Sequence, residues 1–173
     1  MKKALVIGSP GAGKTTFARR LAQKTGLPLI HLDYYYHDKS KDYYSEKNKP
    51  AWYAEVRQLM KRKSWIMDGN YSTTFPERFE EADTIFFFDF PLRLRLYGIF
   101  RRRLQFHKKQ RYDMPDDWQE KITWEFFKFV WNFESYRPKI TSVINQKNGK
   151  KIITFKTRTD AQNYLNSLKT SVK

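Results

Sequence analysis

The chain has 173 residues and no cysteine, which excludes a disulfide framework, a disulfide-linked partner and a thiolate metal site. Its net charge of +16, from 34 Lys and Arg against 18 Asp and Glu, predicts a basic surface that attracts polyanions such as nucleic acid. No apolar run approaches the ~20 residues that span a bilayer, and the short apolar run at 4–7 is not a signal peptide, so we expect a cytoplasmic protein without membrane association.

Hydrophobic patterning predicts strands that alternate with helices along a single domain, residues 1–173. The predicted strands cover residues 4–8, 28–32, 64–67, 84–88 and 151–155. The predicted helices cover residues 14–24, 51–61, 92–104, 160–168 and a long region, 117–144, that Pro138 interrupts or kinks. This alternation is typical of an α/β domain in which helices cover both faces of a parallel sheet.

The turn from the first strand into the first helix carries a phosphate-binding motif. Residues 8–15 match G-x-x-x-x-G-K-[ST] in full and in the strand–helix context that the motif requires. Glycines let the backbone point N–H groups at phosphate, and the helix start adds its positive end. We expect Lys14 to act in catalysis by bridging the β- and γ-phosphates of ATP, and Thr15 to ligate Mg²⁺. The expected nucleotide-binding residues are Gly8, Ser9, Pro10, Gly11, Ala12, Gly13, Lys14, Thr15 and Thr16.

An aspartate ends each of the next three predicted strands. Asp33, Asp68 and Asp89 should therefore meet at the carboxyl edge of the sheet, beside the phosphate loop. We expect Asp68 to contact the Mg²⁺ shell and the substrate, and Asp33 to bind the phosphoryl acceptor or to act as its base. Asp89 stands two residues before Pro91, which favours a capping or supporting role for it.

Residues 90–112 include no acidic residue but many arginines and lysines. On a helical wheel Arg103 falls in the apolar stripe of the predicted helix 92–104, whereas Arg101 and Arg102 point elsewhere. We expect a basic lid near 101–115 in which Arg103 and Arg111 neutralise the transferring phosphoryl group. The alternative is a solvated basic helix or a nonspecific nucleic-acid surface.

Tyrosines gather in a polar segment after Asp33, at positions 34–36 and 43–44. We expect an acceptor-binding insertion near 34–62, in which Tyr36 contacts the substrate. The alternative use of these rings is to pack a small helical subdomain.

Together these residues resemble a known family. The phosphate loop, His-Leu-Asp at 31–33, Trp-Ile-Met-Asp-Gly-Asn-Tyr-Ser at 65–72, Arg78 and Ala-Asp at 82–83 resemble the adenylate-kinase-related proteins called DNA topology modulation (FlaR-like) proteins. The resemblance extends from the first strand to the fifth. It implies a three-layer P-loop NTPase fold like that of nucleoside monophosphate kinases, with sheet order 2-3-1-4-5, and the binding of ATP and Mg²⁺.

The motif at Asp68 departs from adenylate kinases, which read Asp-Gly-Phe-Pro-Arg where this chain reads Asp-Gly-Asn-Tyr-Ser. The proline and the arginine are both missing, so we expect Arg78 to supply a replacement charge to the substrate. The departure leaves the acceptor open.

The leading hypothesis is an ATP-dependent kinase of a nucleotide, a nucleoside or a similar small molecule, in which positioning and electrostatics do most of the catalysis. The second is an ATP-binding, nucleic-acid-associated regulator (DNA topology modulation) without metabolite kinase activity, which the basic charge supports. The third is a kinase of a non-nucleotide metabolite, of the shikimate or gluconate kinase type, which an aspartate like Asp33 also suits.

Overall fold

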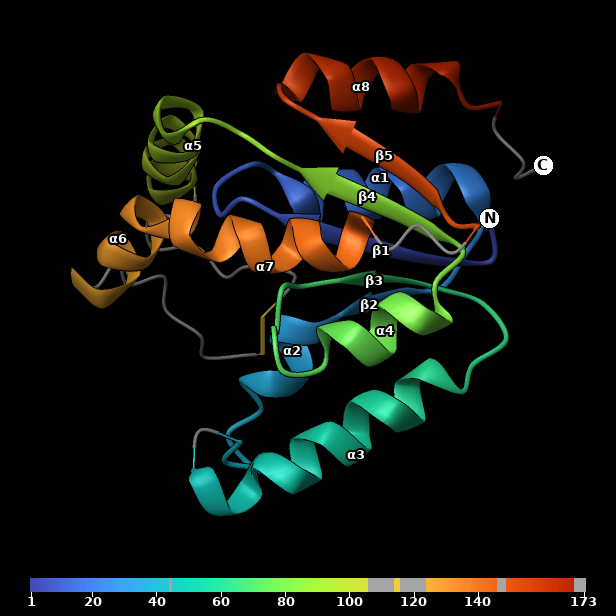
Figure 1. The fold of residues 1–173 in the computed structure, drawn as a ribbon, viewed down its shortest axis with the longest axis vertical. Coiled ribbons are helices and arrows are strands. Elements are labelled where there is room, and N and C mark those ends of the chain that lie inside the picture. The colour runs from blue at the N-terminus through green and yellow to red at the C-terminus, as the bar shows by residue number, and fades with distance from the viewer. Residues whose placement is uncertain (44, 106–113, 116–123, 146–148, 170–173) are drawn as a thin grey trace.

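The structure is a computed structural model that describes residues 1–43, 45–105, 114–115, 124–145 and 149–169. Its centre is a five-stranded parallel sheet with the order β2-β3-β1-β4-β5, which confirms the predicted α/β topology (Figure 1). The strands are β1 (Lys3–Gly8), β2 (Leu29–His31), β3 (Trp65–Asp68), β4 (Thr84–Phe88) and β5 (Lys151–Phe155). The helices are α1 (Lys14–Thr25), α2 (Leu32–Tyr36), the 3₁₀ turn η1 (Glu46–Asn48), α3 (Lys49–Met60), α4 (Phe75–Glu81), α5 (Leu92–Gln105), α6 (Trp124–Trp131), α7 (Phe133–Asn145) and α8 (Arg158–Ser167).

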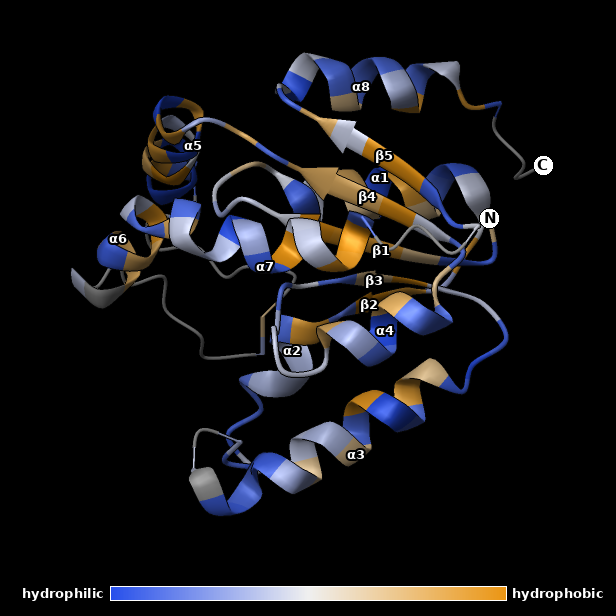
Figure 2. Ribbon diagram, viewed as in Figure 1, coloured by the Kyte–Doolittle hydropathy of each residue, from blue (hydrophilic) through white to orange (hydrophobic). Residues whose placement is uncertain are grey.

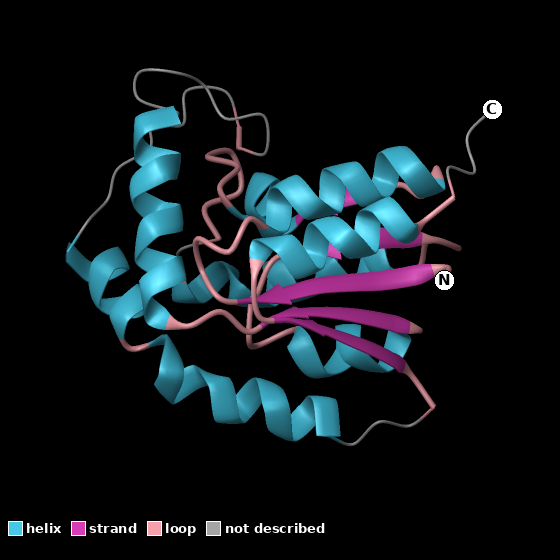
Figure 3. Ribbon diagram, turned by 90° about the horizontal axis from the view of Figure 1, so that it is seen from above, coloured by secondary structure: helices cyan, strands magenta, loops and turns pink. Residues whose placement is uncertain are grey.

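Helices cover both faces of the sheet, as Figure 3 shows from above. Alternate residues of each central strand enter different cores because side chains along a strand point to opposite faces. In β1, Leu5 and Ile7 pack with residues of α3, α4 and α7, whereas Ala4 and Val6 pack with α1 and α8. β1, β3 and β4 are almost wholly buried, and Figure 2 shows apolar residues along these central strands. The molecule therefore has three layers.

The core beneath α1 and α8 is built largely from aromatic rings. Phe17 of α1 lies at its centre, with ring centroids 5.0 Å from Phe86, 5.2 Å from Phe88 and 5.3 Å from Phe155. The phenyl rings meet in tilted or edge-on arrangements, which add to the stabilisation from burial. This cluster fixes α1, and with it the start of the phosphate loop, against β4 and β5.

Two short helices, α2 and α4, differ from the sequence prediction. β2 ends at His31, and Leu32 already begins α2, so Asp33 lies in the first turn of a short helix and does not end a strand. The short helix α4 was not predicted, although Pro76 in its first turn is a typical helix start.

The predicted long helix over 117–144 is divided at Asn132, not at Pro138. α6 ends at Trp131, α7 begins at Phe133, and the Ser135 hydroxyl donates to the carbonyl of Asn132 at 2.7 Å. α7 then continues through Pro138, in its second turn, although proline has no N–H to donate to the preceding turn. The predicted stretch 117–123 lies outside the described residues.

Within the described part of the chain, no helix combines the length and the apolar character needed to cross a membrane.

Replacement of Phe17 tests the role of the aromatic core. We expect Phe17→Ala to lower the free energy of unfolding by about 3–5 kcal/mol, because it leaves a cavity among four other rings. The matched control is Phe100→Ala, since Phe100 is 64% exposed and its loss should change the stability by less than about 0.5 kcal/mol. Urea unfolding measures both, and equal effects would contradict the assignment.

Candidate active site

The carboxyl ends of the central strands open into a cleft of about 1020 Å³. Its walls come from the phosphate loop, from residues 68–71 after β3, and from α2, α5, α6 and α8. In Figure 1, α5 and α6 lie at the end of the sheet toward which the strand arrows point. Lys14, Thr15, Asp33 and Asp68 all line this one cleft. The structure therefore brings together the phosphate loop and two of the three aspartates singled out in the sequence.

The phosphate loop is tied closely to β4. Gly8 has φ +117°, and a Cβ on it would lie 2.3 Å from the carbonyl oxygen of Phe88, so only glycine fits there. The next residue, Ser9, donates its N–H to the Phe88 carbonyl at 2.7 Å, and its hydroxyl accepts from the Phe90 N–H at 3.0 Å. These contacts hold the first two residues of the loop in place at the centre of the sheet.

Lys14 folds back onto its own loop. Its ammonium donates to the carbonyl oxygens of Gly8 and Ser9, each at 2.9 Å. Burial lowers the pKa of the Lys14 ammonium, and the nearby Asp68 and Asp33 carboxylates partly oppose this shift. Arg102, which lines the same cleft, lowers this pKa further by like-charge repulsion.

Each of the two carboxylates in the cleft has a neighbouring polar group. Asp68, the last residue of β3, lies 3.3 Å from the Nδ1 atom of His31. Asp33 accepts a hydrogen bond from the Tyr71 hydroxyl at 2.8 Å. Although Asp33 is in α2 and not at a strand end, it lies only two residues after β2 and therefore still reaches the same edge of the sheet.

Asp89 stands apart from the cleft. Its carboxylate accepts from the side chains of Arg137 in α7 and Lys156 after β5. Arg137 also lies 3.6 Å from Glu134, which in turn accepts from the fully buried Arg95 of α5 at 2.8 Å. Asp89 therefore links α5, α7 and the end of β5. These contacts agree with the supporting role expected from the sequence.

The arginines of α5 differ from the sequence prediction. Arg101 and Arg102 line the cleft, whereas Arg103 is not among the residues that line it. The buried face of α5 carries Arg95, Gly98 and Ile99, while Phe100, three residues before Arg103 and on the same side of the helix, is 64% exposed. The apolar stripe therefore predicted the wrong buried face for this helix.

The contact of α5 with the phosphate loop determines which face of the helix is buried. A Cβ on Gly98 would lie 1.9 Å from the carbonyl oxygen of Gly11, so the helix backbone packs directly on the loop. Arg102 follows one turn later on the same side and faces the cleft. Arg111 and most of the predicted lid near 101–115 lie outside the described residues.

The aromatic residues after Asp33 pack mainly with one another. The Tyr36 ring lies 5.1 Å from Trp52 and 4.9 Å from Tyr71, and Tyr43 and Trp52 are buried in the core. Tyr36 does not line the cleft, so its predicted contact with the substrate is not seen in this arrangement. Packing, the alternative weighed from the sequence, accounts for these rings better. Tyr44 lies outside the described residues.

Arg78 differs most clearly from its predicted role as a substrate contact. The residue is 0% exposed, and its guanidinium donates to the carbonyls of Gly69 (2.8 Å), Asn70 (2.5 Å) and Tyr71 (2.9 Å). Its Nε also donates to the Thr74 hydroxyl at 3.1 Å. Burial lowers the pKa of Arg78 to about 9, so the group remains charged at neutral pH. Arg78 is a structural brace for the loop after β3.

Two residues in the site were not singled out individually from the sequence. The Asn70 side chain accepts from the N–H of Gly8 and donates to its carbonyl, both at 2.9 Å. Arg158, at the start of α8, donates to the carbonyl of Gly11 at 2.8 Å and lies over the rings of Phe90 and Tyr97. Both make contacts across more than 60 residues of sequence, which no local pattern reveals.

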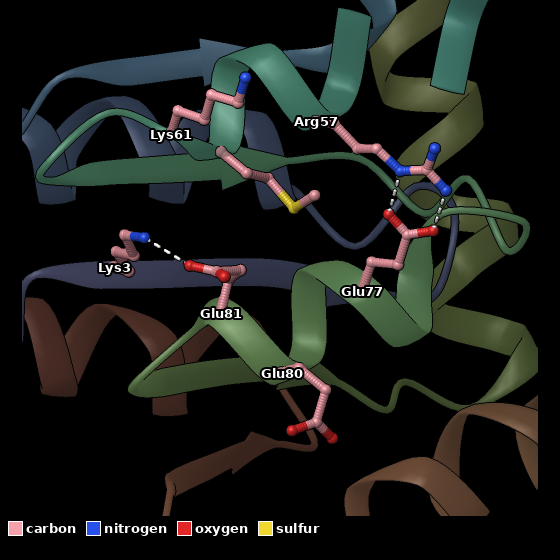
Figure 4. A pocket seen from close by; sticks show the side chains of 7 residues that line it. Lys3, Arg57, Lys61, Glu77, Glu80 and Glu81 are labelled. Carbon is pink, nitrogen blue, oxygen red and sulfur yellow. Dashed lines mark hydrogen bonds and ion pairs between the residues drawn. The ribbon is translucent and has the colours of Figure 1, made fainter. Parts of the chain in front are cut away.

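A smaller hollow, of about 460 Å³, lies between the start of β1, α3 and α4 (Figure 4). Most of its charges are paired: Arg57 donates twice to Glu77, at 2.7 Å each, and Lys3 donates to Glu81 at 2.6 Å. Because it lies at the amino end of β1, opposite the phosphate loop, it is not the candidate active site.

Comparison with known proteins places the chain among P-loop kinase folds. Residues 4–68 match the family model AAA_33, described as an AAA domain. A segment of 77 residues is 34% identical to a shikimate kinase of Parabacteroides distasonis, covering 42% of this chain and 44% of that protein. A segment of 83 residues is 29% identical to an adenylate kinase of Thermotoga neapolitana, covering 48% of this chain and 36% of that protein. The chain thus spans less than half the length of these curated relatives.

Solved structures match over nearly the whole chain, at low identity. A shikimate kinase from Acinetobacter baumannii in complex with shikimate has a TM-score of 0.61 at 19% identity, covering 98% of this chain and 96% of that one. Deoxyadenosine kinase from M. mycoides has a TM-score of 0.50 at 15% identity, covering 97% and 98%. These matches show the fold. The narrower resemblance to DNA topology modulation proteins is not shown by them and stays a prediction.

The bracing role of Arg78 makes a clear prediction. We expect Arg78→Met to lower the free energy of unfolding by roughly 2–4 kcal/mol, because the main-chain carbonyls of residues 69–71 lose their buried donor. Arg62→Met, at an exposed position, should change it by less than about 0.5 kcal/mol. If urea unfolding shows no loss for Arg78→Met, the brace is wrong and a substrate contact is the better assignment.

Proposed function

We propose, for a chain with this P-loop kinase fold, that it is an ATP-dependent phosphotransferase acting on a hydroxyl group of a small molecule. One observation carries the proposal. The loop lysine Lys14, the candidate Mg²⁺ ligands Thr15 and Asp68, the carboxylate of Asp33 and the guanidinium of Arg102 all line a single cleft. Phosphoryl transfer requires these kinds of group around one point: a donor cradle, a metal site, an acceptor contact and a cation for the moving charge.

The donor side fits ATP. Gly13, at the N-cap of α1, has no side chain to cap the first turn, so the N–H groups of that turn are available to a phosphate. The Lys14 ammonium contacts the carbonyls of Gly8 and Ser9 in the same loop and would exchange them for phosphate oxygens. The expected binding residues are those of the loop, from Gly8 to Thr16.

The metal side fits Mg²⁺ held jointly by protein and nucleotide. Among the described residues, no three His, Asp or Glu side chains gather in a group that could hold a metal ion by themselves. Mg²⁺ usually takes one or two protein oxygens together with phosphate oxygens and water. Thr15 and Asp68 are the two oxygen donors that we assign to it, and when bound it would neutralise phosphate charge during transfer.

The acceptor side combines polar and aromatic groups. Asp33 would orient the acceptor hydroxyl or take its proton, and Arg102 would neutralise charge on the transferring group. Phe126 and Phe129 of α6 line the same cleft, and the Arg102 guanidinium lies 5.3 Å from the centre of the Phe126 ring. Aromatic side chains suit the ring of a nucleoside or nucleotide. We therefore keep a nucleoside or nucleotide as the leading acceptor class.

A non-nucleotide metabolite is the second candidate. Asp33 just after β2 and the partial similarity to shikimate kinases favour a small hydroxylated acid or sugar. The nucleic-acid hypothesis stays a prediction that rests on the net charge of +16.

Replacement of Lys14 tests the reaction class. We expect wild-type protein with Mg²⁺ to transfer the γ-phosphate of ATP to a nucleoside, a nucleoside monophosphate or a small hydroxylated metabolite, and Lys14→Ala to lower that rate by roughly 10²–10³-fold. A panel of acceptors with labelled ATP measures both. Absence of transfer by the wild type to every acceptor would refute the kinase proposal.

A second pair of variants distinguishes the structural assignment from the sequence prediction. Arg102→Ala should lower turnover by at least about 10²-fold, because Arg102 lines the cleft near Lys14, whereas Arg103→Ala should change it by less than about threefold. Steady-state kinetics with the identified acceptor decide between them. A larger loss of turnover for Arg103→Ala than for Arg102→Ala would favour the orientation of α5 predicted from the apolar stripe.

A further inference from the structure

The segment after β3 is where this chain departs from the adenylate kinase motif, and the structure gives the departing residues specific contacts. β3 ends at Asp68, which pairs with Val6 of β1, and the Gly69 N–H donates to the Val6 carbonyl at 3.3 Å. Beyond this point the Asn70 side chain makes the hydrogen bonds to the β1 backbone that a strand residue would otherwise make. It accepts from the Gly8 N–H and donates to the Gly8 carbonyl, both at 2.9 Å. Asn70 thus replaces a strand partner at the first residue of the phosphate loop.

The next residue reaches the opposite side of the cleft. Tyr71 has φ +27°, a left-handed conformation that a non-glycine residue rarely adopts. Its hydroxyl donates to Asp33 at 2.8 Å, and its ring packs 4.9 Å from Tyr36 and 5.0 Å from Trp52. The aromatic packing holds the ring, so the hydroxyl contacts Asp33 from a fixed position.

Arg78 makes these two residues one rigid unit. Its buried guanidinium donates to the carbonyls of residues 69, 70 and 71 in turn. Asn70 and Tyr71 therefore cannot move independently without breaking buried hydrogen bonds of a charged donor. One end of the unit contacts the phosphate loop, and the other contacts the carboxylate expected to meet the acceptor.

We propose that Asn70 and Tyr71 are positioning residues that couple the donor site to the acceptor site. Asn70 sets the orientation of Gly8, whose carbonyl also accepts from Lys14, and Tyr71 aims the Asp33 carboxylate. The Phe and Pro that adenylate kinases have at these two positions carry no side-chain hydrogen-bonding group and make neither contact. The part that concerns Asp33 rests on the proposed kinase function, whereas the part that concerns Gly8 does not.

The Asn70 contact is tested without any acceptor. Asn70→Leu has nearly the same size and removes both hydrogen bonds, and Asn70→Ser is too short to span both groups of Gly8. We expect each variant to bind MgADP at least about tenfold more weakly in isothermal titration calorimetry. Asn166→Leu, an exposed position in α8, is the matched control and should bind like wild type. Affinities within twofold of wild type for a folded Asn70 variant would overturn this half of the proposal.

A merely structural role of Asn70 is separated by a second readout. Asn70→Ser should keep the thermal midpoint of the nucleotide-free protein within a few degrees of wild type while its MgADP affinity falls. If affinity falls only in proportion to a loss of folded protein, Asn70 supports the fold and does not position the loop.

The Tyr71 contact is tested in turnover. Tyr71→Phe removes one hydroxyl, and we expect it to lower acceptor-dependent kcat/KM by about 10–100-fold, since the lost bond goes to a charged group, while the MgADP affinity stays unchanged. Tyr34→Phe, at a 50% exposed position in the same helix as Asp33, is the control. In the double variant with Asp33→Asn, the two losses should not multiply, because both act through one hydrogen bond.

Two results would overturn the Tyr71 half: turnover of Tyr71→Phe within twofold of wild type, or fully multiplicative losses in the double variant. If the wild type phosphorylates no acceptor, the kinase proposal fails and the Tyr71 half falls with it. The calorimetric result for Asn70 still decides the link to the phosphate loop.

Discussion

Gly8 is held from both sides, and the candidate site depends on that position. β1 lies between β3 and β4, so the residue that ends it meets Phe88 on one side and Asn70 on the other. The close approach of the Phe88 carbonyl leaves no room for a side chain at Gly8. The loop therefore starts from the central strand of the sheet. From there its backbone leads into α1, whose first turn presents N–H groups to an anion.

The basic charge of the chain serves several purposes at this edge of the sheet. Arg78 is buried among main-chain carbonyls that compensate for its desolvation, and it shapes the loop that carries Asn70 and Tyr71. Lys14 and Arg102 both line the cleft, and the pKa of Lys14 is lowered mainly by burial, with a smaller contribution from like-charge repulsion by Arg102. An anionic ligand would relieve this repulsion. The scaffold and the proposed binding groups are therefore made from the same kinds of residue.

The positions of the strands were predictable because the central strands are short apolar runs, and the sheet order was predictable from the family resemblance. Local patterns failed where long-range contacts decide. The close packing of Gly98 on Gly11 sets the orientation of α5 about its axis, so Arg102, and not Arg103, lines the cleft. The clamp at Asn70 rests on a contact across 62 residues, whereas the brace at Arg78 bonds carbonyls only seven to nine residues away, in a loop whose shape the sequence pattern does not show. β2 ends earlier than predicted and Asp33 lies in the first turn of the short helix α2, yet it lines the same cleft.

The most direct test of this account is a crystal structure with Mg²⁺, a non-hydrolysable ATP analogue and the acceptor. The account predicts that the Lys14 ammonium leaves the Gly8 and Ser9 carbonyls for phosphate oxygens, while Asn70 stays bonded to Gly8. It also predicts the acceptor hydroxyl beside Asp33, with Tyr71 still donating to that carboxylate. A nucleotide bound away from residues 8–16, or an acceptor out of reach of Asp33, would contradict it.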